Sequence, residues 1–237
     1  MNTDNFFLKN GYQSRTSAAT VEEEPGDYWT KWRVNNAFKY QYYVYQYAAE
    51  LVRKHEFKSV IDLGCGVPSK LAHFISPLCS DISIVDQATQ EPFNKKHYPA
   101  FAFYPADLEK DNLEIDRRFD LVICSDVIEH LLDPSKLLLT IKRLMKSDGI
   151  AVISTPERDF ERGEDCLSSP KPEHVREWNS LEFINFLEHS GFNVPKHFLF
   201  PKKKVPKLEW LLKSQFFPGV NNHRWSTCQT AICQKTK

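Results

Sequence analysis

The sequence predicts an α/β fold: one mostly parallel, seven-stranded sheet with helices on both faces. First, short runs of β-branched and apolar residues alternate along the chain with amphipathic segments of helical spacing. Second, glycine or proline stands at the ends of most of these segments. Third, 237 residues suffice for one sizeable core but not for two ordinary domains. Such alternation is typical of parallel strands joined by right-handed crossovers.

Seven runs of the chain have the composition of buried strands. They cover residues 59–63, 82–85, 101–104, 121–124, 150–154, 198–200 and 227–233. Three helices are predicted between or after them. The first lies between two prolines over 68–77, the second over 135–145 is stopped by Asp148-Gly149, and the third over 181–189 is stopped by Gly191.

The N-terminal part of the chain differs from the rest in composition. Residues 1–27 are polar and include an acidic run before Pro25-Gly26, so we expect a loosely ordered arm. The remainder, 28–237, is predicted to be a single domain. It would comprise a helical cap over 28–57, a ligand-binding core over 58–155, and a substrate-side loop with the C-terminal strands over 156–237.

Aromatic residues crowd the predicted cap. Apolar side chains recur there at helical spacing, which predicts a helix running to about His55: Val34, Phe38, Tyr42, Tyr45, Ala49 and Val52. Packing on the core is the favoured interpretation of these aromatics, and a lid over a substrate pocket is the alternative.

The net charge and the hydropathy of the sequence indicate which kinds of partner the protein binds. Lys+Arg and Asp+Glu both number 31, so the neutral balance favours neither nucleic acid nor an anionic membrane. We find no apolar run near the roughly 20 residues that span a bilayer, and no secretory signal at the start. We therefore expect a cytoplasmic protein with a small-molecule acceptor and no membrane insertion.

The six cysteines are scattered, and no two have CxxC spacing. Several lie in strand-like runs, which indicates buried, reduced thiols. A disulfide or metal site at Cys228 and Cys233 is the disfavoured alternative, because their odd spacing places them on opposite faces of a strand.

The turn after the first strand has the composition of a ligand site. In an open parallel sheet, ligands bind beyond the carboxyl ends of the strands, usually at this turn. Gly64 and Gly66 remove side chains where the backbone curls and a ligand approaches. Asp62 ends an otherwise apolar strand, where an unpaired charge is costly, so it orients the loop or meets a cationic group.

Two further aspartates follow the next two strands. Asp86 lies about twenty residues after the glycines, the spacing at which a carboxylate binds ribose hydroxyls. Asp107 is placed to accept a hydrogen bond from an adenine amino group, with Leu108 against the ring. A nicotinamide dinucleotide is the rival ligand, but its motif would need glycine at Ser69 and gives Asp62 no role.

Four segments together resemble the successive motifs of class I S-adenosylmethionine-dependent methyltransferases. They are VIDLGCG at 60–66, SIVD at 83–86, PADL at 105–108 and FDLVICSDVIEH at 119–130, within a resemblance that covers about residues 40 to 200. The resemblance implies a Rossmann-like fold with S-adenosylmethionine as cofactor. It places Gly64 and Gly66 along the methionine part, Asp86 at the ribose and Asp107 at the adenine. Cys65, Gln87, Leu108 and Ser125 complete the expected cofactor site. Pro68 stands where the family often has a third glycine.

The catalytic candidates follow the fourth strand. If residues 126–130 open a helical turn, Asp126, Glu129 and His130 fall on one face. Two carboxylates and an imidazole can hold a divalent cation such as Mg²⁺, which lowers the pKa of an acceptor hydroxyl. The grouping resembles the Glu-x-x-Glu-His element of metal-assisted O-methyltransferases, including those of ubiquinone biosynthesis and of small-RNA 3′ ends, with aspartate first. By that resemblance His174 would be the fourth metal ligand and catalytic residue.

Two other interpretations of this cluster stay open. His130 can act as a metal-free general base, or Glu129 and His130 can simply cap and pack the turn. Arg158 and Arg176 are candidate clamps for an anionic acceptor group, with ordinary salt bridging as the default.

We expect methyl transfer to a hydroxyl of a small molecule or sugar. An RNA-terminus 2′-O-methyltransferase is the alternative, favoured by the acid-histidine cluster and disfavoured by the lack of a broad basic surface. A non-catalytic, cofactor-binding scaffold is the third hypothesis.

Overall fold

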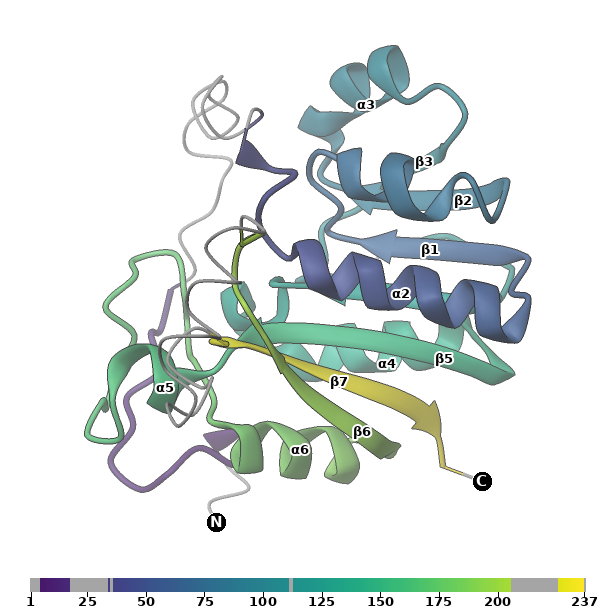
Figure 1. Ribbon diagram of the computed structural model, residues 1–237. Coiled ribbons are helices and arrows are strands. Elements are labelled where there is room, and N and C mark those ends of the chain that lie inside the picture. Colours follow the sequence, from purple (N-terminus) through teal and green to yellow (C-terminus); the bar gives the residue numbers. More distant parts are fainter. Residues whose placement is uncertain (1–4, 18–33, 35, 111–112, 206–225, 237) are drawn as a thin grey trace.

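The computed structural model describes residues 5–17, 34, 36–110, 113–205 and 226–236 (Figure 1). They form one seven-stranded sheet with the order β3-β2-β1-β4-β5-β7-β6. The strands are β1 Ser59–Leu63, β2 Asp81–Asp86, β3 Ala102–Pro105, β4 Phe119–Ser125, β5 Met145–Pro156, β6 Phe192–Phe200 and β7 Cys228–Lys235. β1 to β5 run parallel, and β7 is antiparallel to both β5 and β6. The predicted mostly parallel fold is confirmed.

The helices begin and end at recognisable signals. They are α2 Tyr42–His55, α3 Glu91–His97, α4 Pro134–Leu144, α5 Arg158–Arg162 and α6 Ser180–His189, with the short turns η3 Leu71–Ile75, η4 Ala88–Gln90 and η5 Ile128–His130. Asp133 caps α4 by accepting a hydrogen bond from the Ser135 N–H. Asn179 and Glu182 form a reciprocal capping box at the start of α6.

Two predicted helices have different bounds in the structure. The predicted helix of the aromatic cap is interrupted: Val34 and Asn36 are helical, but the helix that runs to His55 begins at Tyr42. Gln41, just before it, adopts a left-handed conformation with a φ of 51°. Residues 28–33 and 35 lie outside the described part of the chain. Over 68–77 the backbone is helical, but residues 71–75 take the wider π-helical turn, in which the Ser76 N–H donates to the Leu71 carbonyl.

Helices cover both faces of the sheet, as expected for strands apolar on both sides (Figure 1). α2 and η3 bury Val44, Val52 and Leu71 against one face. α4 and α6 pack against the other, where Leu137 and Phe183 are fully buried. The sheet is therefore the middle layer of three, and its strand ends are the places where polar side chains can meet a ligand.

The N-terminal segment is not the loose arm that its polarity suggests. Within residues 5–17, Phe7, Leu8 and Tyr12 are buried in the same core cluster as α4 and α6. The Trp178 indole N–H donates to the Phe6 carbonyl at 2.9 Å. A few apolar side chains are thus enough to fix this stretch, while residues 1–4 and 18–27 lie outside the described chain.

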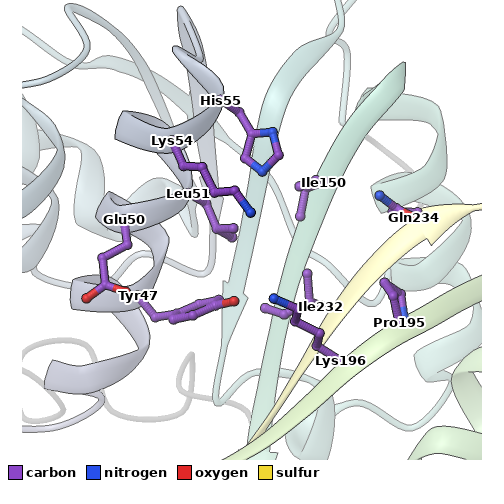
Figure 2. A pocket seen from close by; sticks show the side chains of 10 residues that line it. All are labelled: Tyr47, Glu50, Leu51, Lys54, His55, Ile150, Pro195, Lys196, Ile232 and Gln234. Carbon is purple, nitrogen blue, oxygen red and sulfur yellow. The ribbon is translucent and has the colours of Figure 1, made fainter.

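A groove of about 330 Å³ separates α2 from the C-terminal strands (Figure 2). Tyr47, Lys54 and His55 line it from α2, and Ile150 and Lys196 line it from β5 and β6. Ile150 lies in β5 well before its carboxyl end at Pro156, so this groove is separate from the edge where the predicted site residues gather. None of the described helices is long and apolar enough to cross a membrane.

Candidate active site

Asp62, Asp86 and Asp107 lie at or just beyond the carboxyl ends of three neighbouring strands, β1, β2 and β3. The strand order reverses between β1 and β4, so these ends border the switch point where ligands bind in such sheets. The arrangement predicted for the three carboxylates along one edge is therefore present in the fold.

The glycine turn after β1 is held against the end of β2. The Gly64 N–H donates to the Val85 carbonyl at 2.8 Å, and the Gly66 N–H donates to Asp86 Oδ2 at 2.7 Å. Gly64 has a φ of 71°, and a Cβ there would lie 2.5 Å from a methyl of Val127. The turn therefore requires glycine at 64 for both conformation and space.

Asp62 is fully buried, and only one of its two oxygens is satisfied. The Tyr45 hydroxyl donates to Oδ2 at 2.7 Å, whereas Oδ1 has no hydrogen-bond partner among the described residues. Burial raises the pKa of Asp62 to about 7, despite the opposing effects of Tyr45 and the nearby Lys70. An orphaned oxygen at a ligand-approaching turn indicates that a bound group completes this site.

Asp86 and Asp107 already have local partners. Asp86 Oδ1 accepts from the Gln87 N–H at 2.8 Å, so both of its oxygens hold the backbone of the turn. Asp107 accepts from the Glu109 N–H at 3.0 Å and pairs with Lys110 at 3.0 Å. Their predicted contacts with ribose and adenine would use the second lone pairs of these oxygens, and they stay predictions, as do those of Cys65, Gln87 and Leu108.

Ser125 and Asp126 belong to a polar group at the end of β4. Ser125 Oγ lies 2.7 Å from Ser154 Oγ, and Ser154 Oγ donates to Asp126 Oδ1 at 3.0 Å. Asp126 Oδ2 accepts from the Gln41 side-chain amide at 2.7 Å. Gln41 thus connects the start of α2 to the site.

Asp126 does not share one face with Glu129 and His130, contrary to the predicted spacing. The helical turn begins only at Ile128, and Asp126 has a φ of 53° in the left-handed region. That conformation turns its carboxylate toward Gln41 and Ser154. The predicted common face is therefore not formed, and the group whose ligand atoms lie together omits Asp126. Its role as a metal ligand stays a prediction.

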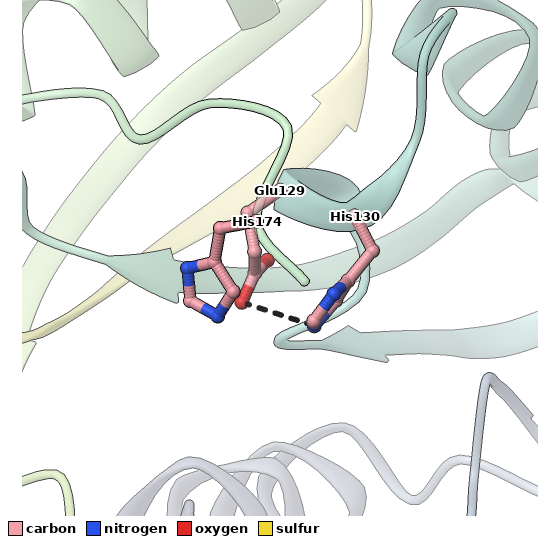
Figure 3. A group of neighbouring side chains, drawn as sticks. All are labelled: Glu129, His130 and His174. Carbon is pink, nitrogen blue, oxygen red and sulfur yellow. Dashed lines mark ion pairs between the residues drawn. The ribbon is translucent and has the colours of Figure 1, made fainter. Parts of the chain in front are cut away.

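Glu129, His130 and His174 do come together (Figure 3). One ligand atom from each lies within 4.8 Å of the others, and Glu129 Oε1 is 4.0 Å from His130 Nε2. The two histidine rings are in edge contact, with centroids 4.8 Å apart. Thr155 donates to Glu129 Oε2 at 3.0 Å and steadies the carboxyl group.

Hydrogen bonds fix which nitrogen of each ring faces the group. His130 Nδ1 lies 2.7 Å from the Glu173 carbonyl, which can only accept, so Nδ1 carries the proton. His174 Nδ1 lies 2.6 Å from Glu177 Oε1 in the same manner. Both Nε2 atoms therefore present lone pairs, the state in which imidazole binds a metal.

The protonation preferences of this cluster follow from burial. Loss of hydration raises the pKa of Glu129 well above its usual value, and the charge of Asp126 adds to the effect. It lowers the pKa of His130 to about 4, helped by the neighbouring His174. Burial opposes ionisation of Glu177 too, but its bonds to His174 and Arg162 bring the pKa down to about 2. Glu177 is thus an anion that orients His174.

The two arginines considered as acceptor clamps have structural partners instead. Arg158 is fully buried and donates to both oxygens of Glu182, at 2.6 and 2.9 Å. Arg176 donates to the carbonyls of Leu131 and Leu132 at 2.8 and 2.9 Å. Arg158 therefore joins α5 to α6, and Arg176 holds the loop after η5 in place.

Three residues of the site had no part in the sequence prediction. Gln41 and Lys70 carry no motif, and their contribution depends on the packing of the chain before α2. Lys70 is buried, donates to the Ala37 carbonyl at 2.8 Å, and has its pKa lowered to about 8 by burial. Glu177 had a detectable signal, since it follows His174 by three residues.

Comparison with known proteins shows which family this chain resembles. Residues 39–197 match the methyltransferase domain family. A protein named "Probable S-adenosylmethionine-dependent methyltransferase" from Mycobacterium tuberculosis is 29% identical over 160 residues, 67% of this chain and 56% of that protein. A ubiquinone biosynthesis O-methyltransferase of Rickettsia akari is 24% identical over 65% of this chain and 63% of its own length.

Two further similarities extend the range of relatives. A small RNA 2′-O-methyltransferase of Mus musculus is 27% identical over 61% of this chain and 41% of its own length. The chain thus spans between 41% and 63% of these three curated relatives. A Burkholderia thailandensis N1-methyltransferase solved with S-adenosylhomocysteine shares the fold, with a TM-score of 0.55, 17% identity, and coverage of 82% of this chain and 79% of that one.

Proposed function

Because the chain belongs to the methyltransferase domain family, we propose that it is an S-adenosylmethionine-dependent enzyme, like the relative from Mycobacterium tuberculosis by its name. We propose further that it methylates a hydroxyl of a small molecule or sugar with the help of a divalent cation. One observation carries this proposal. Glu129, His130 and His174 converge while both histidines are bound through Nδ1, so both Nε2 lone pairs face the carboxylate.

The residues around the glycine turn fit the cofactor. S-adenosylmethionine supplies a methyl group on a sulfonium centre and carries a cationic amino group. The buried Asp62 Oδ1 is an acceptor without a partner among the described residues, and it suits such a cation. Gly64 and Gly66 leave room for close approach, and Ser125 ends β4 beside this turn. Asp62 would hold the amino group while the turn lies along the methionine chain.

The donor set of the cluster fits a divalent cation. One carboxylate and two imidazoles are ligands that divalent transition metals take. Bound there, a divalent cation would supply Lewis acidity that lowers the pKa of an acceptor hydroxyl. Glu129 is buried with a raised pKa, so a cation would also stabilise its ionised form.

His130 gives the alternative route to the same reaction. Its pKa of about 4 keeps the ring neutral at pH 7, and Nε2 is the nitrogen available to take a proton. The metal-assisted and metal-free routes thus differ in whether Nε2 binds a cation or removes the hydroxyl proton.

The experiment begins with labelled S-adenosylmethionine and an extract of the source cells, followed by mass spectrometry of newly labelled compounds. With an acceptor in hand, turnover is measured before and after chelation for wild type, Glu129→Gln and His130→Ala. His97→Ala, at the exposed end of α3, is the matched control. We expect chelation to stop turnover and a divalent transition metal such as Mn²⁺ to restore it. Undiminished turnover after chelation would rule out the metal-assisted route and leave His130 as the general base.

An RNA terminus is the second candidate acceptor. The similarity to a small RNA 2′-O-methyltransferase supports it, whereas the zero net charge does not. A salt-dependent shift of short RNA by the protein, followed by transfer of label to its 3′ end, would favour RNA over a small molecule. Failure to label any compound in the extract would favour the scaffold hypothesis.

A further inference from the structure

We propose that Lys171 is an internal competitor of the metal, because its ammonium group binds the atom of His174 that the cation needs. The inference rests on the metal site of the proposed function. In this inference, Lys171 lowers the affinity of that site for divalent cations.

The competition follows from the chemistry of one ring. His174 Nδ1 is engaged with Glu177 Oε1 at 2.6 Å, which leaves the lone pair on Nε2. Lys171 Nζ lies 3.4 Å from that Nε2. An ammonium has donors only, so the lysine uses the same lone pair that would coordinate a metal. One lone pair cannot serve both.

The backbone holds Lys171 beside this ring. The His174 N–H donates to the Lys171 carbonyl at 3.2 Å, and the Lys171 N–H donates to Ser169 Oγ at 3.2 Å. Ser169 Oγ donates in turn to Glu177 Oε1 at 2.9 Å. Pro170 and Pro172 flank the lysine and restrict the backbone further. The lysine and the histidine thus belong to one rigid turn.

The charged side chains around Lys171 include both signs. Glu129 and Glu161 attract its ammonium, whereas Lys202 and Arg162 repel it. Glu161 is also bound to Lys202, and Glu177 is also bound to Arg162. Burial lowers the pKa of the half-buried Lys171, and its ammonium form adds a positive charge next to the cluster.

A cation that binds Glu129, His130 and His174 must take Nε2 from Lys171 and accept a like charge nearby. The contact given up is weak, since 3.4 Å exceeds the usual hydrogen-bond range of about 2.7–3.2 Å. The metal can therefore displace the lysine, but it binds less tightly than it would without the ammonium. Removing this charge should strengthen binding.

The test measures Mn²⁺ binding to the chelator-treated full chain by electron paramagnetic resonance of the free ion. Lys171→Met removes the ammonium and keeps the length of the side chain, and Lys171→Gln is a second, polar variant. Lys136→Met, at an exposed position of α4, removes one positive charge away from the cluster. Glu129→Gln in each background identifies binding at this site, and circular dichroism checks folding.

We expect Lys171→Met and Lys171→Gln to bind Mn²⁺ at least tenfold more tightly than wild type, with Lys136→Met unchanged and Glu129→Gln abolishing the gain. If the Lys171 variants bind Mn²⁺ and wild type does not, the result would also support the inference, because the ammonium would then prevent binding altogether. Equal or weaker binding by both Lys171 variants, while wild type binds at Glu129, would overturn the inference and leave the metal site standing. If neither wild type nor either Lys171 variant binds, the metal part of the proposed function falls as well.

Discussion

Glu177 accepts a hydrogen bond from His174 Nδ1 at 2.6 Å, and this contact decides that Nε2 of His174 faces Glu129 and His130. The carboxylate is fully buried and is held in its ionised form by Arg162 and His174. Orientation of a ligand histidine by a buried carboxylate is common around metals, and loss of such a partner weakens metal affinity or activity.

Glu177→Gln should therefore lower Mn²⁺ affinity and turnover by about 10- to 100-fold while Glu129 and both histidines are retained. The neutral amide can donate to the ring as well as accept from it, so the tautomer of His174 is no longer fixed. Metal titration and steady-state kinetics measure the two effects. Glu188→Gln, exposed on α6, is the control. Equal behaviour of the two variants would contradict the orienting role.

Asp62 gives a pH dependence to cofactor binding. Burial raises its pKa to about 7, so in the free protein the carboxyl is protonated below that pH. A cationic ligand group favours the ionised form, so binding releases a proton and affinity falls as the pH drops. We expect S-adenosylmethionine to bind about tenfold more weakly at pH 6 than at pH 8, since one pH unit below the pKa costs a factor of ten.

Calorimetry at several pH values measures this dependence, and Asp62→Asn should make it flat. The same pH slope in the variant would assign the effect to another group.

The stability of the free protein depends on pH in the opposite direction from cofactor affinity. The unfolded carboxyl ionises near its usual pKa of 3.8 and the folded one near 7, so the folded state holds the extra proton. The free energy of unfolding therefore decreases as the pH rises through that window.

Asp126 provides a test of which residues bind the metal. Because its carboxylate faces Gln41 and Ser154, Asp126→Asn should change Mn²⁺ affinity by less than about threefold. Glu129→Gln should reduce it by more than about 100-fold, since a carboxylate ligand is lost. Metal titration of both variants makes the comparison. A loss of similar size in the two would return Asp126 to the metal site.

The buried pair between Arg158 and Glu182 should be a large contributor to stability. Removing one member leaves an unpaired charge in the interior, which costs about 3–5 kcal/mol. Arg158→Met is expected to lower the free energy of unfolding by this amount in urea denaturation. Lys95→Met breaks the exposed pair with Glu91 and should cost no more than about 0.5 kcal/mol. If the two variants lost comparable free energies of unfolding, the larger stabilisation expected from the buried pair would be contradicted.

The fold was predictable from local patterns because each pattern has one dominant cause. Alternating apolar runs place strands in a sheet covered on both faces, and Gly191 follows the end of α6 as predicted. Asp148-Gly149 do not stop the preceding helix, because α4 ends at Leu144 and these two residues lie within β5. The strand bounds were less predictable. β6 begins at Phe192 rather than 198 because backbone pairing with β7 recruits polar residues that carry no apolar signal.

The site was predictable where residue type alone determined position. Asp62, Gly64 and Asp86 follow strands and therefore meet at one edge. Asp126 was misplaced because a left-handed backbone at a non-glycine residue leaves no trace in residue spacing. Gln41 was absent from the prediction, since its role depends on a contact with Asp126, 85 positions away in the chain. Lys171 is only three residues from His174, but their contact depends on side-chain directions that residue spacing does not reveal.

The hydrogen bonds from Glu177 and Trp178 to the N-terminal segment join residues 165 and 172 positions apart. During synthesis, the segment with Phe6 and Tyr12 must therefore wait for the segment with Glu177 and Trp178 before either can be locked in place. The loop with His174 gains its backing only after the sheet has formed up to α6. The glycine turn depends on the neighbouring strands β1 and β2, whereas the catalytic cluster also needs the loop with His174, so its contacts span a longer stretch of chain.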